Sequence, residues 1–380
     1  MIFLDFNAGA PLLPAVAEHL SHAFAETAGN PSSVHQVGRA ARRRLDAARE
    51  RVARAFGASS PREIVFTGSG SEAAALAILG GFTARERPER HTVVTATIEH
   101  PCVLGAVKRV EQLGGRVVRV APDSSGVVSA QTMIDALTDE VALCSLMWVN
   151  NETGVRQPVE AVSRACVERG IVFHTDAVQA IGKVPATLRE APADLLSFSA
   201  HKLGGPAGVG VLLNRRQVDV AALVPGHQEN GRRGGTQSVA LAEGLVLALD
   251  AALASQEAET ERLTALRDDF ERRIAAALPA TRVTGRAASR VANTSNLCFP
   301  GVDGEGLLVA LDLEGICVST GAACASGSLT PSHVLTSMGL SAADAQSSIR
   351  VSLGRTTTAA ALDAVVKALV RLVPVTRFAD

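Results

Sequence analysis

The sequence predicts an α/β protein with two domains: a large domain built on a seven-stranded, mostly parallel sheet, and a smaller α+β domain towards the C-terminus. Two observations carry this prediction. Through the first two thirds of the chain, short apolar runs rich in β-branched residues alternate with helical stretches rich in Ala, Leu and Arg. After a long helical stretch, further strand-like runs follow without that alternation. Apolar strands separated by helices are typical of a parallel sheet covered on both faces.

Seven apolar runs are expected to form the large sheet. They are residues 63–67, 92–95, 116–120, 141–149, 171–174, 195–199 and 209–213. In an open sheet of this kind the ligand site lies beyond the carboxyl ends of the strands. Polar residues that directly follow these runs are therefore the first candidates for a site.

The C-terminal third has a different pattern. Residues 240–278 are expected to form one long helix, polar on one face and rich in Ala and Leu on the other. Three further strands are expected at 294–299, 316–319 and 348–353, followed by a helix over about 358–372. We place the large domain at 12–250. The small domain then consists of 1–11 and 251–380.

Composition excludes several classes of function. The net charge of −1 gives no reason to expect nucleic acid or an acidic membrane surface as a partner. No uncharged apolar run approaches the roughly 20 residues needed to span a bilayer, and the first residues do not resemble a signal peptide. The six cysteines have no CxxC pair and no metal-ligand spacing, so we expect free thiols in a reducing cytoplasm. The absence of tyrosine excludes any mechanism that needs a phenol.

A lysine and an acid follow two of the strand-like runs. Lys202 lies just past residues 195–199, and Asp176 lies at the end of the run that begins at Ile171. A lysine after a strand is usually a solvated turn residue. An acid at another strand end makes the pair suitable for pyridoxal 5'-phosphate, because the lysine can form a Schiff base with the cofactor while the acid keeps the pyridine nitrogen protonated.

The turn at residues 67–72 lies between a strand and a helix. Free backbone N–H groups at a helix start, together with small residues, favour binding of a phosphate group at Gly70 and Ser71. The same residues also fit an ordinary helix start with Ser71 as its cap. Ser199 and His201 flank Lys202 and are further donors suited to a phosphate.

Three other polar residues near strand ends are candidates for the same site. His100 follows the run at 92–95; its imidazole can stack on the pyridine ring and carry protons, although a lone histidine is as often structural. Gln179 lies three residues past Asp176 and can hydrogen-bond the phenolic oxygen of the cofactor. Asn151 follows the run at 141–149 and can touch both cofactor and substrate.

Arg350 lies within the strand expected at 348–353. Alternation along a strand places Ile349 and Val351 on one face and Arg350 on the other. A guanidinium on a rigid strand suits bidentate binding of a substrate carboxylate. A surface arginine with an acidic neighbour is the alternative.

Cys324 lies in a segment, residues 319–331, made mainly of Gly, Ala, Ser and Thr. Few bulky side chains are available to hold this cysteine in a core, so we expect the segment to be exposed and mobile. About seven residues of slack can carry a thiol on the order of 20 Å. This suits a nucleophile that reacts in the site and presents its product outside. The other five cysteines lack such surroundings, and we expect them to be core or incidental residues.

Together these motifs resemble the cysteine desulfurases of the NifS/IscS type, in the class V aminotransferase group of fold-type I pyridoxal phosphate enzymes. The resemblance runs nearly end to end. Its most specific segments are residues 149–154, 174–179, 197–202 and 319–324. It implies the fold-type I PLP-dependent transferase architecture for both domains.

The resemblance also implies a role for each candidate residue. Lys202 carries the cofactor, with Asp176 at the pyridine nitrogen, Gln179 at the phenolic oxygen, His100 stacked on the ring and Asn151 beside it. The phosphate is held by Gly70, Ser71, Ser199 and His201. Thr236 matches a residue that the partner subunit contributes to the phosphate site, which implies a homodimer. Arg350, with Asn151, binds L-cysteine.

In the implied reaction, Cys324 takes the substrate sulfur as a persulfide and L-alanine leaves. The sulfur then passes to an iron–sulfur scaffold or another sulfur-acceptor protein. General cluster assembly, nitrogenase maturation and tRNA thiolation would all use this chemistry. No metal site is expected beyond a transient role of Cys324 as an iron–sulfur ligand.

Two other interpretations stay open. A selenocysteine lyase or another class V aminotransferase-type enzyme would share the cofactor site, although a plain aminotransferase has no need of Cys324. A cofactor-binding scaffold without catalysis is the other, and the presence of both Lys202 and Cys324 argues against it.

Overall fold

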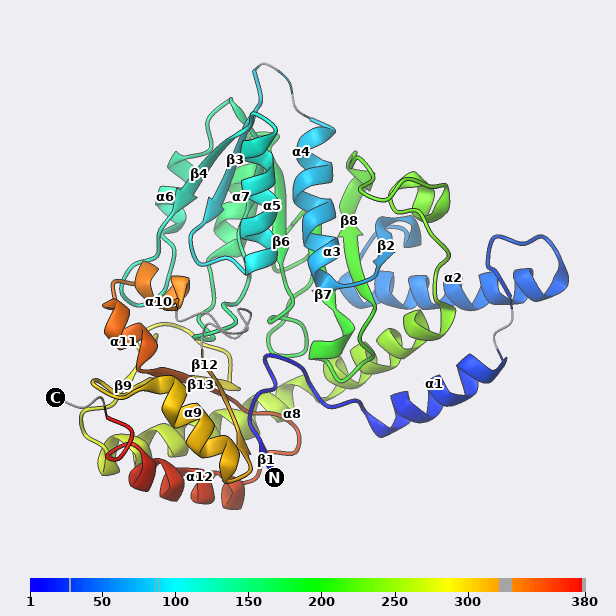
Figure 1. Ribbon diagram of the computed structural model, residues 1–380. Coiled ribbons are helices and arrows are strands. Elements are labelled where there is room, and N and C mark those ends of the chain that lie inside the picture. The colour runs from blue at the N-terminus through cyan, green and yellow to red at the C-terminus, as the bar shows by residue number, and fades with distance from the viewer. Residues whose placement is uncertain (27–28, 86, 88, 321–329, 378–380) are drawn as a thin grey trace.

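The computed structural model describes residues 1–26, 29–85, 87, 89–320 and 330–377. Within these residues the chain forms a large lobe around one sheet and a smaller lobe that contains the C-terminal third (Figure 1). The N-terminal segment runs between the two lobes, and the long helix α8 (Val239–Ala277) extends from one to the other.

The sheet of the large lobe has seven strands in the order β2-β8-β7-β6-β5-β3-β4. Their bounds are β2 Ile64–Thr67, β3 Thr92–Ala96, β4 Arg116–Val120, β5 Val141–Ser145, β6 Val172–Asp176, β7 Leu195–Ser199 and β8 Gly210–Asn214. The five neighbouring strands β7, β6, β5, β3 and β4 pair in parallel, whereas β8 is antiparallel to both of its neighbours. The predicted α/β class and seven-stranded, mostly parallel sheet are confirmed.

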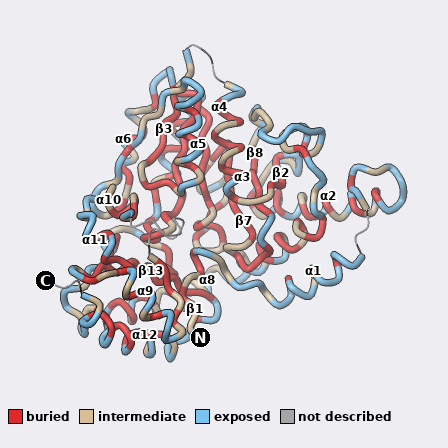
Figure 2. The backbone as a smooth tube through the Cα atoms, viewed as in Figure 1, coloured by how far each residue is buried: buried red, intermediate tan, exposed pale blue. Residues whose placement is uncertain are grey.

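Side chains alternate between the two faces of this sheet, and helices cover both. Leu143 and Leu195 belong to a core shared with α3 and α5, whereas Phe173 and Phe198 belong to a core shared with α2, α7 and α8. Every residue of the five strands β3, β5, β6, β7 and β8 is buried, which explains why these runs are apolar almost throughout. Figure 2 shows buried residues concentrated along the strands.

In the described part of the chain, seven shorter α-helices precede α8 in the large lobe. They are α1 Pro14–Glu26, α2 Gln36–Phe56, α3 Gly70–Ala75, α4 Gly81–Thr83, α5 Pro101–Gln112, α6 Ala130–Asp135 and α7 Val159–Glu168. A π-helical turn over Leu76–Gly80 joins α3 to α4. Helical backbone therefore runs from Gly70 to Thr83 and begins at the phosphate turn expected from the sequence.

The small lobe is built on a four-stranded antiparallel sheet in the order β12-β13-β10-β9 and a two-stranded parallel pair, β1 with β11. The strands are β1 Ile2–Phe3, β9 Arg282–Val283, β10 Thr294–Cys298, β11 Ile316–Cys317, β12 Ser319–Thr320 and β13 Ser348–Ser352. The helices are α9 Gly304–Leu313, α10 His333–Ser337, α11 Ala342–Gln346 and α12 Ala359–Leu372.

The core of this lobe draws on both ends of the chain. Leu4 packs with Phe270, Leu297, Ile349 and Leu369 in a cluster separate from the two cores of the large sheet. The apolar side chains of α10 and α11 instead join a core of the large lobe. The domain bounds 12–250, 1–11 and 251–380 stay a prediction.

By length and composition alone, α8 is the one helix among the described residues that is apolar enough to cross a membrane, and 44% of its most apolar window is buried inside the molecule. Ser238 caps its start by accepting a hydrogen bond from the Leu241 N–H. Leu245 and Leu249 are buried in the core of the large lobe, and the helix packs along α1 and α2. These contacts are those of a core helix.

Candidate active site

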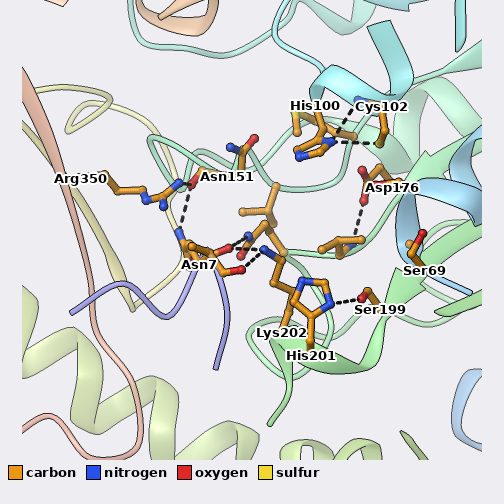
Figure 3. A pocket seen from close by; sticks show the side chains of 17 residues that line it. Asn7, Ser69, His100, Cys102, Asn151, Asp176, Ser199, His201, Lys202 and Arg350 are labelled. Atoms are coloured by element: carbon orange, nitrogen blue, oxygen red, sulfur yellow. Dashed lines mark hydrogen bonds between the residues drawn. The ribbon is translucent and has the colours of Figure 1, made fainter. Parts of the chain in front are cut away.

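A cavity of about 290 Å³ lies at the carboxyl ends of β6 and β7, between the two lobes (Figure 3). Ten residues that the sequence singled out line it. They are Gly70, Ser71, His100, Asn151, Asp176, Gln179, Ser199, His201, Lys202 and Arg350. They come from the ends of β6 and β7, the turns after these two strands, the loop after β5, the starts of two helices and one strand of the small lobe. The cavity therefore lies where ligand sites of open α/β sheets are expected, beyond the carboxyl ends of the strands.

Lys202 and Asp176 enter the cavity from neighbouring strands. Asp176 is the last residue of β6, and Lys202 ends a short 3-10 turn that directly follows β7. The Lys202 ammonium group donates to the backbone carbonyls of Asn7 and Ala8, each at 2.7 Å. Asp176 Oδ1 accepts from the Val178 N–H at 2.9 Å. Burial raises the pKa of Asp176 to about 6, against the opposing effects of the Val178 hydrogen bond and the Lys202 charge.

The helix that starts at Gly70 points its first backbone N–H groups towards the same cavity. Ser69 is the residue that caps it, with its Oγ accepting from the Glu72 N–H at 3.0 Å, so the alternative in which Ser71 is the cap is wrong. A Cβ at Gly70 would lie 3.0 Å from Ser199 Cβ and 3.1 Å from Val178 Cγ2. Glycine is thus what lets the helix start approach the end of β7. Ser71 is among the residues that line the cavity.

Ser199 and His201 lie on the other side of this helix start. The Ser199 hydroxyl contacts His201 Nδ1. Burial, followed by the charge of Lys202, lowers the pKa of His201 to about 4. A neutral imidazole and a hydroxyl beside the first backbone N–H groups of a helix form a set of groups that suits a phosphate.

His100 caps the start of α5, and this position determines its tautomer. Its Nδ1 accepts from the Cys102 N–H at 3.2 Å and lies 3.0 Å from Cys102 Sγ. Burial, followed by the charges of Lys202 and His333, lowers the pKa of His100 to about 4. The neutral ring therefore accepts at Nδ1 and carries its proton on Nε2.

Arg350 reaches the cavity from β13 of the small lobe. Its Nη2 pairs with Asp5 Oδ1 at 2.7 Å, and its Nη1 donates to the Asn151 carbonyl at 3.1 Å. Only 3% of its side chain is exposed. Its Nε has no hydrogen-bond partner within the described part of the chain. Ile349 and Val351 are buried in the core on the opposite face, as the period of the strand requires.

Comparison with known proteins shows the family of this chain. Residues 2–365 match the aminotransferase class-V family. The chain belongs to that family. The cysteine desulfurase NifS of Azotobacter vinelandii is 41% identical over 96% of this chain and 91% of its own length. A cysteine desulfurase of Nostoc sp. is 40% identical over 98% of this chain and 93% of its own. A solved NifS-like protein has a TM-score of 0.91 at 32% identity, covering 98% of this chain and 99% of its own.

The two other predicted site residues are Thr236 and Cys324. Thr236 is exposed and lies outside the cavity lining. Cys324 falls within 321–329, outside the described residues. No group of three or more His, Cys, Asp or Glu residues that could hold a metal ion is present in the described ranges.

Four residues of this site were missed by reasoning from the sequence. Cys102, expected to be a core or incidental residue, lines the cavity beside His100, and burial raises the pKa of its thiol to about 12. Asn7 lines the cavity and Asp5 pairs with Arg350. Lys183 contacts Gln179 from outside the lining. The available signals were a cysteine two residues into a helix start, polar residues beside a buried Leu4, and a lysine four residues past Gln179.

Proposed function

We propose that this chain is a pyridoxal phosphate-dependent cysteine desulfurase that converts L-cysteine to L-alanine and carries the sulfur as a persulfide on Cys324. The observation that carries the proposal is the meeting of Lys202, Asp176 and the helix start at Gly70 in one cavity. Membership of the class-V family and the names of relatives about 40% identical over nearly the whole chain support the same reaction.

The residues present fit pyridoxal phosphate at each of its polar ends. The backbone at Gly70, which a Cβ would obstruct, together with Ser71, Ser199 and His201, would hold the phosphate group. Asp176 would pair with the pyridine nitrogen, Gln179 with the phenolic oxygen, and Lys202 with the aldehyde carbon. His100 and Asn151 lie beside the space left for the ring. When bound, the cofactor supplies an electron-accepting ring that stabilises negative charge at the substrate Cα.

The substrate carboxylate is assigned to Arg350 and Asn151. Arg350 is buried and already oriented by Asp5 and by the Asn151 carbonyl, while its buried Nε has no hydrogen-bond partner among the described residues. A guanidinium in this state binds a second carboxylate without first having to be ordered. Arg350 therefore orients the substrate with its amino group towards Lys202.

Proton movement is assigned to His100 and Lys202. His100 is neutral near pH 7, holds its proton on Nε2 and has Nδ1 engaged by Cys102, so it can hand over or hold a proton only at Nε2. Lys202 already lies among polar groups, with the Asn7 and Ala8 carbonyls as acceptors. Its amino group would take up or release the proton at the substrate Cα.

Sulfur transfer is assigned to Cys324. Its thiolate attacks the substrate sulfur, an S–S bond forms, and the C–S bond breaks with its electrons going to the carbon that becomes the methyl group of alanine. The balance is L-cysteine plus the Cys324 thiol to L-alanine plus the Cys324 persulfide. No outside oxidant is needed, and a sulfur-acceptor protein or an iron–sulfur scaffold then receives the sulfur. A transient role of Cys324 as a cluster ligand belongs to the same proposal.

The assembly is proposed as a homodimer in the cytoplasm. Thr236 is exposed on a segment at the surface of the subunit, which leaves it available to complete the phosphate site of a partner subunit. That arrangement matches the role that family resemblance gives to this threonine.

The test is the stoichiometry of products from L-cysteine with a reductant, comparing wild type with Cys324→Ala. The matched control is Cys317→Ala, which removes a thiol of β11 that does not line the cavity. We expect equal amounts of alanine and sulfide from wild type and the control, and neither from Cys324→Ala. Sulfide from Cys324→Ala at the wild-type rate, or no sulfide from wild type, would contradict the proposal.

A further inference from the structure

Lys183 is a charged residue beside the cavity that the proposed reaction does not use. It follows Gln179 by four residues, in the turn after β6. Its ammonium group donates to Gln179 Oε1, and to Asn7 Oδ1 at 2.9 Å. Gln179 and Asn7 both line the cavity, whereas Lys183 does not. Lys183 therefore lies behind the cavity wall and touches it through two amide side chains.

The contact with Lys183 determines which way the Gln179 amide faces. An ammonium group has donors only, so the amide oxygen must face it and the amide nitrogen must face elsewhere. That nitrogen donates one hydrogen to the Asn7 carbonyl at 2.9 Å. An amide nitrogen carries two hydrogens, and the second remains for the cavity. If the amide were reversed, its nitrogen would face the Lys183 ammonium group, so that two donors would meet. Its oxygen would face the Asn7 carbonyl, so that two acceptors would meet.

The surroundings of Lys183 are cationic. Lys202 and Arg350 are the charged groups whose fields act on it, and both disfavour its charge. Two carboxylates at the cavity act on other cations: Asp5 pairs with Arg350, and Asp176 interacts with Lys202. Burial, followed by these two positive charges, lowers the pKa of Lys183 to about 7. An anion bound in the cavity would favour the ammonium form.

We propose that Lys183 is a positioning residue that turns the Gln179 amide nitrogen towards the phenolic oxygen of bound pyridoxal phosphate and places a positive charge behind it, which stabilises the deprotonated oxygen. This inference rests on the proposed function, because it needs the cofactor in the cavity. The charge acts through Gln179, since Lys183 does not line the cavity itself.

The consequence is a shift in the titration of the bound cofactor. A cation near the phenolic oxygen favours the more negative form of the cofactor group, so it lowers the pH midpoint of the visible absorption band. Removing the cation raises that midpoint. For Lys183→Met we expect an upward shift of about one pH unit. We also expect about tenfold weaker binding of pyridoxal phosphate, because the Gln179 oxygen loses its donor.

The experiment compares wild type, Lys183→Met, Lys183→Arg and the control Lys108→Met, which removes an exposed lysine of α5. Each holoenzyme is titrated spectroscopically, and each apoenzyme is titrated with pyridoxal phosphate to obtain Kd. Thermal melting reports on folding. If Lys183→Met does not fold, Lys183→Gln is measured in the same way, with the same expected direction. We expect Lys183→Arg and Lys108→Met to keep the wild-type midpoint.

The outcomes separate this inference from the function on which it rests. A raised midpoint and weaker Kd in Lys183→Met, with both restored in Lys183→Arg, would support it. A wild-type midpoint in Lys183→Met, even with a lowered melting temperature, would overturn the inference and leave the proposed function standing. Wild-type protein that takes up no pyridoxal phosphate would overturn both.

Discussion

Two buried arginines, Arg290 and Arg350, carry the same charge in different surroundings. Arg290 forms a two-point ion pair with Glu271, with Nη1–Oε1 at 2.8 Å and Nη2–Oε2 at 2.9 Å, and the two side chains are 5% and 4% exposed. Arg350 pairs with Asp5 through a single contact at 2.7 Å, and the Asp5 side chain is 21% exposed.

The difference separates an arginine whose pairing with a carboxylate is complete from one that keeps an unpaired donor among the described residues. The guanidinium of Arg290 meets one carboxylate with two parallel hydrogen bonds, which is the full match between the two groups. Arg350 has one carboxylate contact, one carbonyl contact and an Nε without a partner in the described ranges, and it faces the cavity. Burial alone does not tell these residues apart, whereas the count of satisfied donors does.

The largest expected effect is that of Arg350→Lys. A compact ammonium group cannot contact Asp5 and a substrate carboxylate as the planar guanidinium does. We expect kcat/KM for L-cysteine to fall on the order of a thousandfold, mostly through KM, which corresponds to about 4 kcal/mol. Steady-state kinetics measures kcat and KM for L-cysteine. The visible absorbance of the cofactor shows whether the variant has bound pyridoxal phosphate as fully as wild type. An unchanged KM would remove Arg350 from substrate binding.

The matched change at the structural arginine is Arg290→Gln. It leaves Glu271 buried without its partner, so the free energy of unfolding is expected to fall by about 3 kcal/mol. KM for L-cysteine should stay at the wild-type value. Urea unfolding measures the first quantity and kinetics the second. The double variant Arg290→Gln/Glu271→Gln should regain part of the lost stability, and a change of KM in Arg290→Gln would break the distinction.

The sequence allowed the sheet and the side of the cavity formed by Asp176 and Lys202 to be predicted, because both follow from local pattern. Apolar runs locate the strands, and polar residues at the ends of those runs must lie at one edge of the sheet. Asp176 and Lys202 were found in this way.

The groups that the sequence did not reveal depend on contacts between distant parts of the chain. Asp5 meets Arg350 because the N-terminal segment packs beside β13, 345 residues away in the sequence. Asn7 contacts Lys183, Lys202 and Asn293 across both lobes for the same reason. The antiparallel direction of β8 also has no local signal in its residues.

A buried carboxylic acid that interacts with Arg350 should make stability depend on pH. Burial raises the pKa of Glu152 to about 7, while Ser332 and Arg350 oppose the shift. Because this folded-state pKa lies above the ordinary value of 4.5 for a glutamic acid, the stabilisation is present below about pH 4.5 and is lost as the pH rises through about 7. Relative to Glu152→Gln, wild type should therefore lose about 2 kcal/mol of unfolding free energy between pH 5 and 8. Urea unfolding at both pH values measures this; parallel pH profiles would show that Glu152 does not titrate in this range.

The smallest expected effect is that of Asp5→Asn. Asparagine can still accept a hydrogen bond from Arg350, so the guanidinium stays oriented while the competing charge is gone. We expect KM for L-cysteine to fall about threefold, in line with the modest energies of partly exposed pairs. Glu314→Gln, which breaks the exposed pair with Arg371, is the control and should leave KM unchanged. A raised KM in Asp5→Asn would mean that the Asp5 charge positions Arg350 and does not compete with the substrate.

The central claim, that Lys202 holds pyridoxal phosphate in this cavity, can be tested by peptide mapping. The sequence contains only four lysines, Lys108, Lys183, Lys202 and Lys367, so borohydride reduction of the holoenzyme followed by mass spectrometry can assign the modified residue without ambiguity. We predict a pyridoxyl adduct on the Lys202 peptide alone. An adduct on Lys183, or none on any lysine peptide, would contradict the account.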